Sequence, residues 1–163
     1  MKGKVVVGLF ILAGLFFSAC SFDLFKKSYD ASLVTFYVDD GNVPKSEYSQ
    51  SKVEIIPNYE SRTLDVKYVK KDNSSSDIPG SKGLVGGEFF DRFEKVLDLI
   101  NNGSFDSSQK ENKKDGGKFL IKVKRKTGLT DEHDLTLMKS DENFDFVNGF
   151  YLDLVDLFSK NVY

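Results

Sequence analysis

Apolar residues alternate with charged ones in several short stretches, and this period of two most constrains the fold. In TLDVKYVKK, residues 63–71, leucine, valine and tyrosine alternate with aspartate and lysine. Such alternation is typical of a β-strand with one buried and one solvated face. KFLIKVKRK, residues 118–126, alternates similarly, and HDLTLMK at 133–139 is predicted as its hairpin partner across Thr127-Gly128. Stretches rich in β-branched and aromatic residues predict two more strands, at 32–38 and 52–56.

Two other stretches repeat their apolar residues with the 3.6-residue period of an amphipathic α-helix. Ser140 or Asp141 is predicted to cap the second of these helices, because a short polar side chain can accept a hydrogen bond from the first turn. The first stripe consists of Phe89, Phe93, Val96, Leu97 and Ile100, and the second of Phe144, Val147, Tyr151, Leu154 and Phe158, widened by Phe150, Val155 and Leu157.

The order of these elements is a strand followed by two hairpin–helix units. Runs of strands followed by helices indicate the α+β class. We therefore expect residues 31–163 to form a single α+β domain, an antiparallel sheet of about five strands with two amphipathic helices packed on one face. Residues 72–81 and the polar stretch 104–117 are predicted as loops, and the glycines of 83–88 as a turn into the first helix.

The N-terminal segment has the composition of an export signal. Lys2 and Lys4 precede thirteen residues without a charge, and the small pair Ser18-Ala19 then leads to Cys20, the single cysteine of the chain. This arrangement resembles the lipobox of bacterial lipoproteins, whose cysteine carries a diacylglycerol and follows the cleavage site. Phe17 stands where leucine is usual, as in the looser boxes of spirochaetes.

The resemblance implies a signal peptide at 1–19, a lipidated Cys20, with palmitate among its acyl chains, and a place in the bacterial cell envelope. Two other interpretations remain open: the apolar segment is an uncleaved membrane-spanning helix, or Cys20 is an ordinary buried cysteine. A single cysteine argues against a scaffold of disulfides. Ser21 after the cysteine is not a retention residue of the aspartate kind, so the outer membrane is slightly preferred over the inner one.

Cleavage before Cys20 would leave 144 residues, with 21 basic residues against 25 acidic ones and a net charge of −4. This mild charge does not indicate a nucleic-acid partner. Residues 20–30 are expected to form the lipidated cysteine and a short tether. The apolar residues of this tether, Phe22, Leu24 and Phe25, would either dock on the domain or enter the bilayer interface.

No catalytic set is marked out by residue type and spacing. His133, the single histidine, lies in TDEHDL and is interpreted as part of a solvated hairpin turn, because a zinc site needs several nitrogen or sulfur ligands. A nucleophile with a positioned base is not recognisable either. The sequence therefore assigns no catalytic, cofactor-binding or metal-binding residue.

Lysines and one arginine concentrate in residues 118–126. Lys122, Lys124, Arg125 and Lys126 are candidate contacts to a membrane or another anion, because the domain would hang close to a bilayer. The alternative is that they form the solvated face of a strand, where lysine also deters edge-to-edge pairing.

These features predict a membrane-anchored lipoprotein of the cell envelope, a non-enzymatic module that binds another envelope protein or a ligand and uses no cofactor. The alternative is an envelope hydrolase or wall-modifying enzyme whose site is assembled only in the fold, around His133 or two facing carboxylates.

Overall fold

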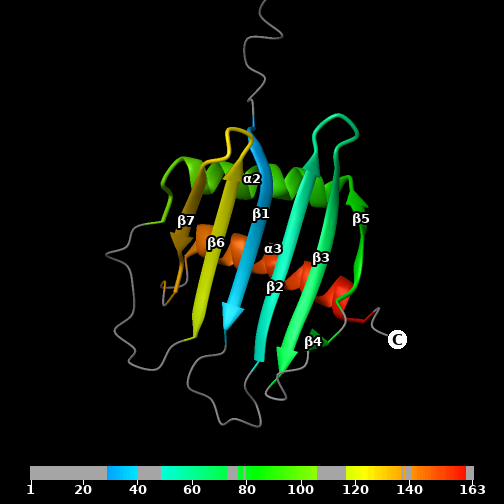
Figure 1. Cartoon of the computed structure of the whole chain (residues 1–163). Helices are drawn as coiled ribbons and strands as arrows, with labels where there is room; N and C mark the ends of the chain where they lie inside the picture. Colours follow the sequence, from blue (N-terminus) through cyan, green and yellow to red (C-terminus); the bar gives the residue numbers. More distant parts are fainter. Residues whose placement is uncertain are drawn as a thin grey trace, which may run out of the picture.

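The structure is a computed structural model, and it describes residues 29–39, 49–72, 77–78, 80–105, 117–136, 138 and 141–160. These residues form two layers, with one sheet in front and two helices crossing behind it (Figure 1). The predicted signal peptide, Cys20, and the tether up to residue 28 lie outside the described residues, as does most of the predicted loop at 104–117.

The sheet is antiparallel throughout and has the order β4-β3-β2-β1-β6-β7, with β5 also paired to β3. The α+β prediction is confirmed. The described sheet has seven strands because the short β4 and β5 both lie along the outer edge of β3. The strands are β1 (Ala31–Asp39), β2 (Ser49–Asn58), β3 (Thr63–Asp72), β4 (Asp77–Ile78), β5 (Lys82–Gly86), β6 (Lys118–Arg125) and β7 (Thr130–Asp134).

Helices α2 (Glu88–Asn101) and α3 (Glu142–Ser159) cover one face of this sheet. Asp141 caps α3, because its carboxylate accepts a hydrogen bond from the backbone N–H of Phe144 at 2.8 Å. Of the two predicted caps, Asp141 is therefore the correct one. None of the described helices combines the length and apolar character that crossing a bilayer requires.

Large aromatic rings fill the space between the layers. Phe150 of α3 lies 6.1 Å from the ring of Phe36 on β1 and 6.4 Å from that of Phe93 on α2, measured between centroids. All three side chains are fully buried. Because Phe150 contacts both the sheet and the other helix, it joins the three parts of the core.

The buried face of α2 differs from the predicted one by one residue. Phe90 is fully buried, whereas Phe89 lies at the margin of the interface, half-buried, with the guanidinium of Arg92 5.9 Å from its ring centroid. The other predicted residues of this stripe are buried. In α3 the prediction places Leu157 in the stripe, but its side chain is 39% exposed.

The last strand begins and ends earlier than predicted. The hairpin turn spans Lys126–Leu129, so β7 already begins at Thr130. It ends at Asp134, whose carboxylate accepts a hydrogen bond from the backbone N–H of Thr136 and turns the chain. The apolar residues that suggested a strand up to 139, Leu135 and Met138, pack into the core beyond the turn.

The chain is held to the body from Tyr29 onward. The Tyr29 hydroxyl donates a hydrogen bond to Asp98 of α2 at 3.0 Å, and its ring stacks on Tyr59 after β2. Asp30 accepts a hydrogen bond from the Arg125 guanidinium, and its carbonyl accepts one from the Lys126 N–H at 2.7 Å. The chain therefore enters the body between the β2–β3 and β6–β7 hairpins.

Candidate binding face

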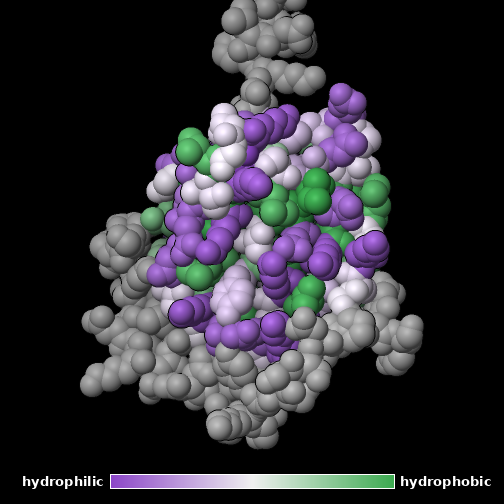
Figure 2. Space-filling view, viewed as in Figure 1, coloured by the Kyte–Doolittle hydropathy of each residue, from purple (hydrophilic) through white to green (hydrophobic). Residues whose placement is uncertain are grey.

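One face of the sheet is not covered by either helix, and we call it the open face. Its side chains alternate with the buried ones along β1, β2, β3 and β6. Figure 2 shows this face, where hydrophilic and apolar side chains are intermixed. The open face of these four strands presents Leu33, Thr35, Tyr37, Gln50, Lys52, Glu54, Ile56, Asp65, Lys67, Val69, Lys71, Lys118, Leu120, Lys122 and Lys124.

The register of the strands arranges these side chains in rows across the sheet. Thr35 is paired with Glu54 on one side and with Lys122 on the other. The next row pairs Tyr37 with Lys52 and with Leu120. Each row thus has a hydroxyl-bearing residue of β1 at its centre and a lysine on one side, whereas Glu54 or Leu120 lies on the other side.

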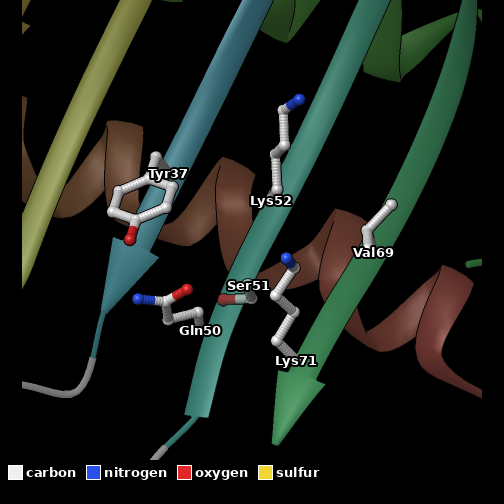
Figure 3. Close-up of a pocket in the computed structure, with 6 residues that line it drawn as sticks. All are labelled: Tyr37, Gln50, Ser51, Lys52, Val69 and Lys71. Carbon is white, nitrogen blue, oxygen red and sulfur yellow. The ribbon is translucent and has the colours of Figure 1, made fainter. Parts of the chain in front are cut away.

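Shallow hollows mark the open face. The central one encloses about 580 Å³ over Leu33, Tyr37 and Leu120, with lysines at its margin. A second, of about 340 Å³, lies toward the end of β1 and is lined by Tyr37, Gln50, Ser51, Lys52, Val69 and Lys71 (Figure 3). Such wide, open depressions fit a binding partner with a broad surface better than a small molecule, because a small molecule is normally buried in a deep pocket.

Lysines outnumber acids on this face. The hollows described here, together with a third of about 230 Å³ beside β5, are lined by six lysines and by two acids, Glu54 and Asp65. The Glu54 carboxylate lies 2.6 Å from the Lys52 ammonium and 3.8 Å from that of Lys67, so it forms ion pairs with both lysines. At the edge strand β7, Glu132 pairs with Lys122 at 2.7 Å.

The helix layer has the opposite charge. Helices α2 and α3 together carry eight acidic residues and two basic ones. Helix α3 contributes four of the acids and no base. The body is therefore polarised, with a basic sheet face and an acidic helix layer, although its overall charge is small.

The structure divides the four predicted basic contacts into two groups. Lys122 and Lys124 project from the open face of β6. Arg125 points to the other side, where its guanidinium bonds Asp30 and Asp131 at 2.8 Å each and also donates to Asn101. Lys126 lies in the hairpin turn, with its ammonium 5.2 Å from the centre of the Tyr59 ring.

Sequence reasoning missed the lysines that β2 and β3 add to this face. Lys52, Lys67 and Lys71 are separated from β6 by more than forty residues in the sequence, and only the strand pairing brings them together. The alternation of β3 already indicated that Lys67 faces solvent. That signal could not show which other strands share its face.

His133 lies in β7 rather than in the hairpin turn, so the interpretation as a solvated turn is wrong. Its partner across the ladder is Ile121, a fully buried residue, and its ring faces the helix side of the sheet. Within the described residues, its buried Nε2 has no hydrogen-bond partner. The three hollows lie on the opposite face, so His133 does not line them.

Among the residues that the structure describes, no three histidine, cysteine, aspartate or glutamate side chains are grouped as metal ligands would be.

Comparisons with protein-family models, with curated proteins and with solved structures find no match to this chain. The fold and the candidate face together define an α+β two-layer body with one open, basic sheet face.

Proposed function

We propose that this protein is a membrane-anchored lipoprotein of the bacterial cell envelope and that its body is a non-enzymatic binding module. We infer the anchor from the sequence Ser18-Ala19-Cys20, which follows an uncharged run of thirteen residues. A lipoprotein cysteine carries two or more acyl chains, which hold a protein on a bilayer stably, whereas one chain does so only marginally.

The open face supports the binding role. It exposes aliphatic and aromatic groups between charged ones, which is the composition of a surface that associates with another macromolecule or an extended ligand. Its hollows are lined mainly by lysine, tyrosine and aliphatic side chains, and the one histidine of the chain faces away from them. The body would present this face within the envelope while Cys20 holds the chain to the membrane.

Labelling with palmitate in bacteria that express the chain tests the anchor. We expect label in the wild-type protein and none in Cys20→Ala. Equal labelling of both proteins would contradict the anchor, since the label would then lie elsewhere.

Photo-crosslinking tests the binding face. A benzophenone amino acid in place of Tyr37 would lie in the two larger hollows, whereas the same group in place of Leu152, 52% exposed on α3, would lie on the helix layer. We expect a discrete adduct from position 37 and none from position 152. Adducts from position 152 alone would contradict the assignment of the open face.

A further inference from the structure

We propose that the open face of the sheet lies against anionic lipid headgroups of the membrane that holds the anchor. This inference rests on the proposed function, because the anchor keeps the body close to a bilayer. It names the ligand of the open face as the membrane surface, and it assigns the body an orientation with the sheet toward the lipid and the helices away from it.

Charge polarity is the first argument. The six lysines that line the hollows would be attracted to an anionic surface, whereas the eight acids of α2 and α3 would be repelled. At physiological ionic strength the Debye length is about 8 Å, so the layer nearest the membrane contributes most of the interaction. The orientation with the sheet toward the lipid is therefore favoured, although the whole chain is mildly acidic.

The acids of the same face reduce this attraction without cancelling it. Glu54 and Asp65 lie among the lysines, and Glu132 pairs with Lys122 at the edge. Register also places Asp39 and Asp134 at the margins of the face. The remaining excess of lysine is sufficient for orientation, because the anchor already holds the protein on the membrane and the lysines need not supply the binding affinity.

The shape of the face is the second argument. Its hollows are shallow and broad, and apolar side chains such as Leu33, Leu120 and the 54%-exposed Ile56 lie between the lysines. Long lysine side chains can lay their methylene groups along such a surface and direct the ammonium groups outward to phosphates. Apolar groups between them can then enter the interface between headgroups and acyl chains.

The length of chain before the body is the third argument. Tyr29 and Asp30 are fixed between two hairpins at one end of the sheet. Nine residue steps separate Cys20 from Tyr29, and they can span at most about 30 Å at 3.3–3.6 Å per residue. A strand of nine or ten residues is also about 30 Å long, so the whole open face lies within reach of the membrane.

Tryptophan fluorescence tests this orientation, because the chain has no tryptophan of its own. Ile56→Trp places a probe on the open face, and Leu152→Trp places one on α3 at a nearly equal exposure, 54% against 52% for the native side chains. Each lipidated protein is inserted through its anchor into vesicles of phosphatidylcholine alone or of phosphatidylcholine mixed with phosphatidylglycerol. Brominated lipids serve as quenchers.

We expect the probe at position 56 to shift to shorter wavelength and to be quenched in the anionic vesicles only, and raised salt to reverse both effects. The probe at position 152 should give the same emission in both kinds of vesicle. An unchanged emission at position 56, or equal changes at both positions, would overturn the inference.

Charge reversal provides the matched control. Each positive charge near an anionic surface favours contact by roughly fivefold, so reversing two lysines, a change of four charges, lowers the equilibrium constant for contact of the sheet with the lipid roughly 600-fold. In the Ile56→Trp background, Lys118→Glu with Lys124→Glu should abolish the shift, whereas Lys95→Glu with Lys160→Glu on the helix side should preserve it. Equal effects of the two pairs would contradict the proposed orientation.

The outcomes separate this inference from the proposed function. Wild-type protein that does not float with vesicles would contradict the anchor and therefore both proposals. Protein that floats but shows no shift at position 56 contradicts the lipid contact alone. A protein adduct from the benzophenone at position 37, without that shift, would assign the open face to a protein partner and also overturn the lipid contact.

Discussion

At the scale of single residues, burial lowers the pKa of His133 because a charged imidazolium would lose solvent on the helix side of β7. Asp131 opposes this effect and Arg125 adds to it. The unfolded chain then binds a proton more readily than the folded one. The free energy of unfolding should therefore decrease as the pH falls through the ordinary histidine value of 6.5.

We predict that His133→Phe removes this pH dependence. Between about pH 7.5 and about pH 5.5, where carboxylates stay mostly ionised, the wild-type protein should lose more unfolding free energy than the variant. Urea unfolding at both pH values measures the difference. A variant that loses as much stability as the wild type over this range would show that His133 is not the responsible group.

Arg125 holds the entry of the chain to the β6–β7 hairpin, because it bonds both Asp30 and Asp131 with its own side chain 17% exposed. We predict that Arg125→Met lowers the free energy of unfolding by about 1–2 kcal/mol, since two carboxylates lose a charged donor. Lys122→Met, on the same strand, breaks the half-exposed pair with Glu132 and should cost less than about 1 kcal/mol. Similar losses in chemical denaturation would contradict this distinction.

At the scale of elements, the cap of α3 gives a direct test. Asp141 satisfies the N–H of Phe144, so Asp141→Ala should lower the free energy of unfolding by about 1 kcal/mol. Asp141→Ser should preserve most of it, because a hydroxyl can also accept this hydrogen bond. Thermal and urea unfolding measure both variants, and an alanine variant as stable as the wild type would show that the cap contributes nothing.

β3, β6 and both helices could be predicted because their apolar residues follow one period over many positions. β1 and β2 could be predicted because they are rich in β-branched and aromatic residues. β5 was not predicted because KGLVG contains two glycines, which are typical of a turn into the following helix. One of them, Gly83, faces α3, where an added Cβ would lie 3.0 Å from the Phe158 ring, so the packing of a distant helix explains a glycine that local patterns attribute to a turn.

The wrong placement of Phe89 in the buried stripe, a position that Phe90 occupies, has a similar cause. The buried face of α2 depends on how the helix rotates against the sheet. Phe90 packs against Tyr59 at 5.9 Å and Phe93 at 6.3 Å between ring centroids. The contact with Tyr59 joins α2 to the turn after β2, which periodicity within one helix cannot reveal.

At the scale of the whole molecule, the two layers depend on the ring contacts that Phe150 makes with both of them. We predict that Phe150→Ala lowers the free energy of unfolding by about 3–5 kcal/mol, because it removes a fully buried ring and leaves a cavity. Leu157→Ala, at an exposed position of the same helix, should cost less than about 1 kcal/mol. Comparable losses would contradict the placement of Phe150 at the centre of the core.

The candidate face also belongs to this scale. Sequence could identify the lysines of residues 118–126 as a basic concentration, but not that Lys52 and Lys67 join it, because that depends on strand register. Arg125 was grouped with these lysines although the two-residue period of β6 places it on the face of the buried Ile121 and Val123. The acidic helix layer, in contrast, follows from composition once the two helices are recognised.

The intact mass of the protein purified from membranes tests the central claim most directly. If Cys20 carries the anchor, the mass should be that of a chain beginning at Cys20 with a diacylglycerol on its sulfur, with or without a further acyl chain on its amino group. The mass of an unmodified chain that begins at Met1 and retains a free thiol would contradict the account.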